Sequence, residues 1–322
     1  MKHLTTIALR PAALAAIALA AIAHAHAQAP ATPTVPAAPR QGPPAAPAAP
    51  AAPGRPVVSA PPAPAGPKEI PFEGAAPSAA EIFRKHLDAT GGEQAWAGKT
   101  QMRSKGAIEI PSAGLKGSNE TVAVAPDKVL VTIDLPGMGQ TRSGSDGTVG
   151  WSIDPMRGPA LMDDKQLAQL RQESNFRLDV ELAKDPKDAQ VTGLFDFEGA
   201  PCWRVTMKPA GGTGEMHRFY DKETGLLRGM GMKMPTPMGE IPATVVTSDY
   251  KDFGGIMLST RSVMKVMGQQ QVMTVDEVAW DGVDPKAFEL PAEIKALKEA
   301  PAKPEGGAAT ADPGKPAPPA GK

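Results

Sequence analysis

A run of methionines is the part of the chain whose residue types most clearly suggest chemistry. The stretch GMGMKMPTPMG, residues 229 to 239, contains Met230, Met232, Met234 and Met238. Thioethers are soft ligands that select copper(I), and they are also flexible, polarizable side chains that suit a surface repacking around varied apolar ligands. Three interpretations follow: a copper(I) site, the lining of a hollow for an apolar ligand, or ordinary core.

Copper binding makes the strictest demand on geometry. Alternate residues of one strand lie about 7 Å apart, which is wide for a single ion unless Met238 or another strand folds over it. Met264, Met267 and Met273 could supply that strand, and His217 is the only histidine near the run. We predict no metal site and no cofactor.

The chain also lacks the residue patterns of common enzymes. After the leader, its only histidines are His86 and His217, and it has no H-E-x-x-H or C-x-x-C spacing, no G-x-S-x-G elbow and no P-loop. Cys202 precedes Trp203 on a predicted strand, where a thiol at an edge or on the polar face is a simpler interpretation than a nucleophile. We predict a protein without catalytic residues.

Apolar residues at every second position predict the elements that hold these side chains. Such alternation, in short runs separated by Gly, Pro, Asp and Asn, is typical of antiparallel strands. In the strand with the methionines, Leu226 shares the face of Met230, whereas Leu227, Gly229 and Gly231 point the other way, and the glycines predict close backbone approach or strong curvature. The predicted strands are 102–110, 116–124, 129–135, 138–144, 149–153, 190–197, 202–208, 215–220, 226–234, 243–251, 256–266 and 270–280.

Two helices and a short helical turn are predicted beside the strands. The first begins after Pro77 and Ser78 and ends at Gly91 and Gly92, and a helical turn follows over 94–98. The other covers 163–176. A long antiparallel sheet must curl or be covered to hide its apolar face, so these helices are the expected cover.

Both ends of the chain predict segments outside the folded domain. Lys2 and Arg10 flank the start of an apolar stretch of about a dozen residues, too short to span a bilayer, and Ala25-His26-Ala27 fits a cleavage site. We predict export to the periplasm, cleavage after Ala27 and no transmembrane anchor after processing. The predicted divisions are a signal peptide (1–27), a disordered Pro/Ala-rich linker (28–76), a β domain (77–298) and a disordered tail (299–322).

Several stretches resemble the LolA-like periplasmic lipoprotein carriers, and they occur in the family's order. GSDGTVGWSIDP is similar to the family's DG-x-x-x-W-x-x-DP hairpin, FYDKETGLLR to its acidic-Gly hairpin, SDYKDFGGIMLST to its Y-x-D-x-x-G-I-x-L-P strands, and DGVDPKAFELP to its final stretch. The resemblance covers about residues 79 to 294. It implies an α+β, mainly β fold, in which a curved antiparallel sheet forms an unclosed β-barrel covered by a few helices. It also implies an apolar hollow for acyl chains and no catalysis; the carriers' functional arginine has no matching position.

The predicted function is an exported, non-catalytic protein that holds lipoprotein acyl chains or a lipid in the hollow of the sheet. Alternatives are a cell-envelope scaffold with a solid core, contacting a protein partner through the Pro/Ala arm, and a methionine-based copper(I) binder. Nucleic acid is excluded as a partner, because the net charge is -1 and no long block of either sign occurs. The predicted ligand-binding residues are Val129, Val131, Ile133, Trp151, Ile153, Trp203, Val205, Met207, Met230, Met232 and Met234.

Overall fold

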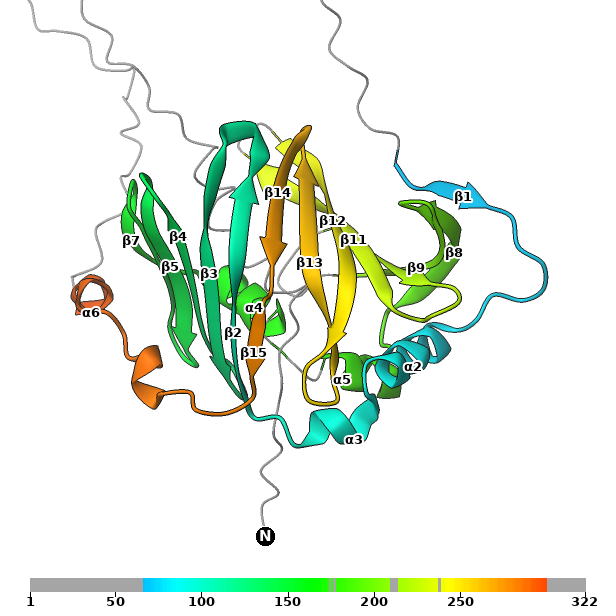
Figure 1. The fold of residues 1–322 in the computed structure, drawn as a ribbon, viewed down its shortest axis with the longest axis horizontal. Helices are drawn as coiled ribbons and strands as arrows, with labels where there is room; N and C mark the ends of the chain where they lie inside the picture. The colour runs from blue at the N-terminus through cyan, green and yellow to red at the C-terminus, as the bar shows by residue number, and fades with distance from the viewer. Residues whose placement is uncertain (1–65, 174, 176–177, 209–213, 237–238, 300–322) are drawn as a thin grey trace, which may run out of the picture.

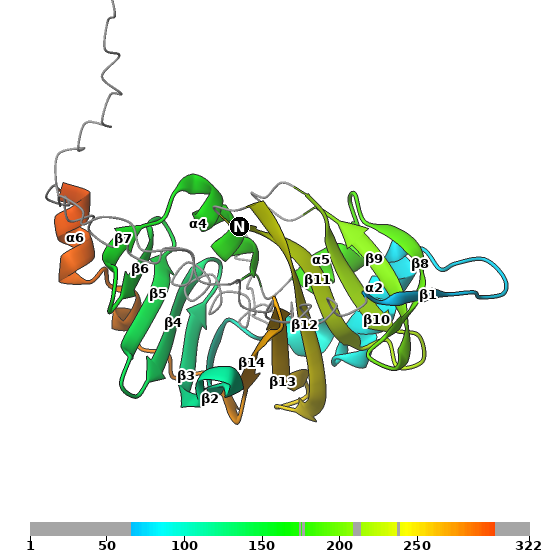
Figure 2. The ribbon, with the colours of Figure 1, turned by 90° about the horizontal axis from the view of Figure 1, so that it is seen from above.

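One antiparallel sheet dominates the computed structural model, which describes residues 66–173, 175, 178–208, 214–236 and 239–299 (Figure 1). Its 15 strands follow the order β1-β8-β9-β10-β11-β12-β13-β14-β2-β3-β4-β5-β6-β7, and β15 pairs with β2. The edge strands β1 and β7 do not pair with each other, and the sheet is strongly curved (Figure 2). The predicted open, curved, mainly β fold is therefore confirmed.

The first half of the sheet is a meander in which each strand pairs with the next along the chain. Its alternation is clearest in the strand that follows Asp127, where Val129, Val131 and Ile133 are buried and Leu130 and Thr132 are less so. At the turn after the following strand, the Asp146 carboxylate accepts hydrogen bonds from the backbone amides of Thr148 and Val149. The strands are β2 (Gln101–Ile110), β3 (Leu115–Val124), β4 (Lys128–Leu135), β5 (Gly139–Asp146), β6 (Gly150–Asp154) and β7 (Gly158–Leu161).

A second meander, from β8 to β15, joins the first where β14 and β15 pair with β2. In the pairing of β14 with β2, Met273 lies opposite Ile108, and Val272 lies opposite Glu109. The expected strand 270–280 is two strands, separated where the chain passes from β14 to β15 along β2. The strands are β8 (Gln190–Phe197), β9 (Ala200–Met207), β10 (Met216–Asp221), β11 (Leu227–Thr236), β12 (Gly239–Asp252), β13 (Met257–Val266), β14 (Gln269–Thr274) and β15 (Glu277–Ala279).

The helices lie at both ends of the sheet and over its middle (Figures 1 and 2). The first begins with a capping box, in which Ser78 and Glu81 satisfy each other's backbone amides. The α-helices are α2 (Ala79–Ala89), α3 (Gly92–Ala97), α4 (Asp164–Glu173), α5 (Leu178–Lys184) and α6 (Ala292–Glu299), and the 3-10 helices are η1 (Pro111–Ala113) and η2 (Pro285–Phe288). Helices α2, α3 and α4 match the predicted helical segments, whereas α5 and α6 were not predicted.

The described structure begins inside the range predicted as linker. Strand β1 (Lys68–Ile70) pairs with β8, and the ring of Phe72 meets Trp203 edge-on with 4.9 Å between centroids. Part of the predicted linker, Lys68–Ile70, therefore belongs to the sheet. The predicted signal peptide, residues 28–65 and the tail beyond Glu299 lie outside the described residues.

Candidate ligand-binding face beneath the helices

One face of the sheet, the inner face, carries the main core and lies under α2 and α5. Strand register places Val205, Arg218, Met230, Val245 and Met264 side by side on it, across β9 to β13. The apolar residues of this row belong to one buried cluster with Phe83 and Leu87 of α2 and Val180 and Leu182 of α5. Helix α5 covers this row at Arg218, which Asp179 contacts, and the apolar side chains of both helices pack into the same core.

A second row on the inner face consists largely of methionines. Met207 of β9 lies opposite Met216 of β10, which lies opposite Met232 of β11. Directly opposed residues have Cβ atoms about 5 Å apart, so neighbouring thioethers are within contact. The three side chains are buried or partly buried against the main core. They form a continuous soft surface beside the helix-covered row.

The structure divides the predicted ligand-binding residues into groups. The strand register and the shared core place most of them on the inner face, at two distant parts of the sheet. Trp151 and Ile153 lie on the opposite face. Trp151 pairs with Gly144, which pairs with Leu130, and Leu130 points away from the face of its neighbours Val129 and Val131. Met234 lies in β11 and Met238 is outside the described residues. The residues on the inner face are Val129, Val131 and Ile133 of β4, and Trp203, Val205, Met207, Met230 and Met232 of β9 and β11.

The predicted side assignment of Leu226 and Leu227 is wrong. The pairing of β10 with β11 shifts between Phe219, opposite Gly229, and Tyr220, opposite Leu227. This irregularity turns Leu227 into the main core, where it is fully buried, and leaves Leu226 only partly buried. A bulge reverses the alternation on which the prediction depended.

A buried charged cluster lies between the inner face and the helices. Arg218 of β10 is 4% exposed, and its Nη1 donates to the Tyr220 hydroxyl at 3.1 Å and to Asp179 Oδ1 of α5 at 3.5 Å. His86 Nε2 of α2 lies 3.7 Å from Asp179 Oδ2. Burial alone lowers the pKa of Arg218, but Tyr220 and Asp179 outweigh it and raise that pKa. Arg218 therefore stays charged under the helices.

Helix α2 is also fixed to the turn between β10 and β11. His86 Nδ1 lies 2.9 Å from the Gly225 carbonyl, and Lys85 Nζ donates to the Lys222 carbonyl at 2.8 Å. Because a carbonyl oxygen only accepts, Nδ1 of His86 carries a hydrogen. The rings of Phe83 and His86 both meet Tyr220 edge-on. The cover is thus held by polar contacts as well as by packing.

The opposite face of the same strands carries a smaller core around Cys202. Phe195, Phe197 and Phe219 pack with this cysteine, and the rings of Phe197 and Phe219 stack at 4.3 Å. Burial, followed by the charge of Asp221, raises the pKa of Cys202 to about 12. The thiol is therefore a buried core group, and its predicted place at an edge or on a polar face is wrong, because β9 lies between β8 and β10 and this face is packed with aromatic rings.

The expected partners for a copper site do not gather around the methionine run. Met264 is two strands away from Met230, and Met267 lies on an exposed turn. His217 points to the other face, where its Nδ1 lies 2.9 Å from the Thr206 hydroxyl. Within the described residues, no cluster of three or more His, Cys, Asp or Glu side chains has the geometry for a metal ion.

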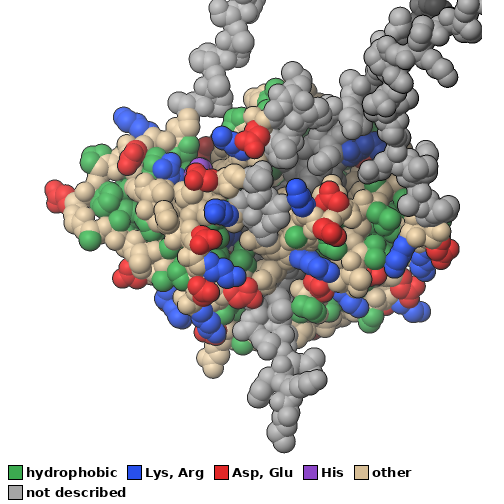
Figure 3. Space-filling view, turned by 180° about the vertical axis from the view of Figure 1, so that it is seen from behind, with side chains coloured by type: hydrophobic (Ala, Val, Ile, Leu, Met, Phe, Trp, Pro, Cys, Tyr) green, Lys and Arg blue, Asp and Glu red, His purple; other side chains and the backbone are tan. Residues whose placement is uncertain are grey.

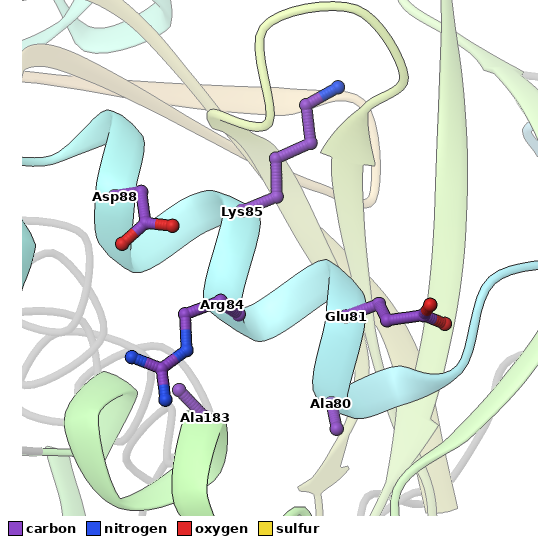
Figure 4. Close-up of a pocket in the computed structure, with 6 residues that line it drawn as sticks. All are labelled: Ala80, Glu81, Arg84, Lys85, Asp88 and Ala183. Carbon is purple, nitrogen blue, oxygen red and sulfur yellow. The ribbon is translucent and has the colours of Figure 1, made fainter.

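The outer surface of the helices contains a separate, charged hollow. Its volume is about 450 Å³, and Figure 4 shows it between α2 and α5, with Glu81, Arg84, Lys85 and Asp88 around it and Ala183 beneath. These charged side chains are exposed. The hollow is open to solvent on the outer surface of the helices and is distinct from the inner face.

Charges are mixed over the molecular surface. Figure 3 shows acidic and basic side chains interspersed, with no large block of either sign on that face. Across the described part of the chain, every helix is too short or too polar to cross a membrane.

Sequence reasoning missed the cluster of Arg218, Asp179 and His86. Arg218 stands between Met216 and Tyr220 at period two, but both faces of β10 are buried, so alternation does not reveal which side chains face the core. His86 was recoverable from the sequence, because it follows Phe83 by one helical turn and so shares its buried face.

No family model matches the chain, and no curated protein is significantly similar to it. Similar solved structures include a LolA superfamily protein from Nitrosomonas europaea, with 13% identity, a TM-score of 0.46, and coverage of 66% of this chain and 98% of the other. A DUF1329 family protein from Desulfovibrio piger has 14% identity, a TM-score of 0.44 and coverage of 66% and 95%. An outer membrane lipoprotein-sorting protein domain from Vibrio parahaemolyticus has 12% identity, a TM-score of 0.43 and coverage of 68% and 97%. The chain is thus similar to LolA-like and lipoprotein-sorting proteins at low identity.

Proposed function

We propose that the protein is an exported, non-catalytic carrier that holds an apolar ligand, lipoprotein acyl chains or a lipid, between the inner face and helices α2 and α5. The observation that carries this proposal is the row of Met207, Met216 and Met232 beside a helix-covered apolar row. Thioether side chains change rotamer easily, so such a surface repacks around different chains. The LolA-like motifs agree with this function.

Ligand entry requires the helices to move, because the side chains that meet the ligand are now buried against them. Each methylene transferred from water to this face contributes about 0.8 kcal/mol before ordering costs. The polar ties of Asp179 to Arg218 and of His86 to the Gly225 carbonyl must lengthen or break as the cover lifts. The free energy lost with these contacts must be offset by the free energy of ligand binding.

The first test is mass spectrometry of an organic extract from the protein, exported with its own leader and purified without detergent. Co-purifying fatty acid or phospholipid at about one ligand per protein supports the proposal. An unrelated exported protein, treated identically, gives the background. A clean extract, followed by failure to take up added lipid, overturns the proposal.

Lining variants then locate the ligand. Met232→Asp places a charge on the inner face and is expected to abolish lipid uptake while the protein stays folded. Met156→Asp is the matched control, because Met156 is 78% exposed on the turn between β6 and β7. Equal lipid uptake by the two folded variants would contradict a ligand site at Met232.

A second candidate is an envelope scaffold with a solid core. It is favoured by the dense packing of Phe83, Leu87, Val180 and Leu182 against the inner face. Such a protein takes up no lipid, and deletion of residues 28–65 removes its partner contact without unfolding the domain.

Copper(I) binding is a third candidate, favoured by the adjacency of Met207, Met216 and Met232. Silver(I) titration tests it, because silver(I) has the same preference for thioethers. A thermal shift that disappears in Met216→Leu supports the site, and no shift in the unaltered protein excludes it.

A further inference from the structure

We propose that Arg218 receives the anionic head of the ligand, so that the carrier selects acyl chains ending in a carboxylate or phosphate over neutral ones. This inference rests on the proposed function and adds the ligand's chemical class. It assigns a binding role to a residue for which neither the sequence motifs nor the packing of the core gives a reason.

Arg218 has unused hydrogen-bonding capacity in a buried place. Its two hydrogen bonds both come from Nη1, and Nε has no partner among the described residues although it is shielded from water. A guanidinium has five N–H donors in a planar fork that matches two oxygens of a carboxylate or phosphate. The 3.5 Å contact with Asp179 is longer than a strong charge-assisted bond. An oxyanion that contacts Nε and Nη together satisfies this group better.

Apolar side chains extend from Arg218 in the direction a ligand chain would take. Met230, Val245 and Met264 follow it across β11, β12 and β13, and Gln271 of β14 comes next. At about 4.8 Å per strand, this row is on the order of 19 Å long. Gln271 is buried, and its Nε2 has no hydrogen-bond partner in the part of the chain that the structure describes. The row therefore presents a cation at one end, an apolar surface along its length and an amide donor at the other end.

The position of Asp179 explains why charge on the ligand matters. Asp179 belongs to α5, so lifting this helix from the sheet separates the carboxylate from Arg218. A neutral ligand then leaves a buried arginine without its counter-charge, which is costly. An anionic head takes the place of the Asp179 carboxylate, while Asp179 moves toward water. The exchange replaces one ion pair by another and involves no covalent bond.

Binding of matched acid and alcohol ligands tests the inference. Palmitate and hexadecanol compete for the full mature protein against a fluorescent uncharged lipid, and lysophosphatidate and monoacylglycerol form the second pair. We expect each anion to bind about 10 to 100 times more tightly than its neutral partner. The pair with the larger ratio of anion affinity to neutral affinity shows whether the site prefers a carboxylate or a phosphate head.

Variants attribute the preference to Arg218. Arg218→Met should bind acid and alcohol equally well, with alcohol affinity unchanged. Arg218→Lys should retain part of the preference for the acid. If Arg218→Met fails to fold because Asp179 no longer contacts the Arg218 guanidinium, the double variant with Asp179→Asn serves instead. Arg204→Met is the matched control, since Arg204 lies on the other face over the ring of Phe195; it should keep the full ratio.

The outcomes separate this inference from the proposed function. Binding of neither acid nor alcohol to the unaltered protein overturns both. Equal binding of acid and alcohol, or a preference that survives in folded Arg218→Met, overturns the role of Arg218 and leaves the carrier function intact.

Discussion

Gly229 of β11 lies against the ring of Phe197 of β8, although β9 and β10 separate these strands in the sheet. A Cβ atom built on Gly229 would lie 2.5 Å from Cζ of Phe197 and 2.2 Å from the Val245 carbonyl oxygen. Strands three positions apart in a flat sheet are about 14 Å from each other. The contact therefore requires strong coiling of this end of the sheet, and glycine at position 229 permits it.

Replacing Gly229 tests this coiling. Gly229→Ala should lower the free energy of unfolding by about 1–3 kcal/mol, because the methyl group meets backbone on one side and a packed ring on the other. Urea denaturation measures the change. Gly231→Ala is the control, since its Cβ would have only Phe219 nearby, at 3.8 Å. That variant should unfold within about 1 kcal/mol of the original protein. Equal stability of the two variants contradicts the close approach.

The thiol of Cys202 should report unfolding. It is fully buried, and its pKa of about 12 keeps it protonated, whereas alkylating reagents attack the thiolate. At neutral pH we expect iodoacetamide labelling to be negligible in the native protein and complete in urea. Mass spectrometry measures the labelled fraction over time. Rapid labelling without denaturant is inconsistent with the cluster of Phe195, Phe197 and Phe219 around the thiol.

Local sequence patterns predicted most of the strands and the start of α2, because alternation, turn residues and caps act over a few positions. Ser78 and Glu81 form a cap that depends on nothing distant. The junction of the two meanders is different. Ile108 opposite Met273 is a pairing between residues far apart in the chain, and neither strand contains information about the other. Local patterns therefore do not reveal the strand order.

The candidate site was predicted in part for the same reason. Alternation placed Met230 and Met232 on one face, and the sheet register agrees. It also suggested Trp151 as a lining residue, but which face of β6 joins the inner face depends on pairing through Gly144 and Leu130. Asp179 lies on a helix of seven residues, too short to show a clear apolar period.

The titration of His217 should make stability depend on pH. Burial, followed by the charge of Arg204, lowers the pKa of this histidine below its ordinary value of 6.5, and Glu215 opposes them. The unfolded chain therefore takes up the proton first, and stability should fall as pH decreases through 6.5, with no contribution from this group at higher pH. Histidine NMR gives the pKa directly. His217→Gln should reduce the slope of unfolding free energy against pH; an unchanged slope, with a pKa at or above 6.5, refutes the prediction.

The pair of Asp179 and Arg218 should show strong coupling in a double-mutant cycle. Asp179→Leu leaves a guanidinium in a place that is 4% exposed, and it should destabilise the protein by about 3–5 kcal/mol. Adding Arg218→Met removes that charge and supplies an apolar chain of similar length, so the double variant should recover much of the loss. Urea denaturation of the four proteins gives the coupling energy. Additive losses would mean that the two charges do not stabilise each other, and that α5 is held by its other contacts, which include the packing of Val180 and Leu182 and the ion pair of Lys184 with Glu93. A large coupling would instead mean that any ligand lifting α5 must replace the Asp179 carboxylate.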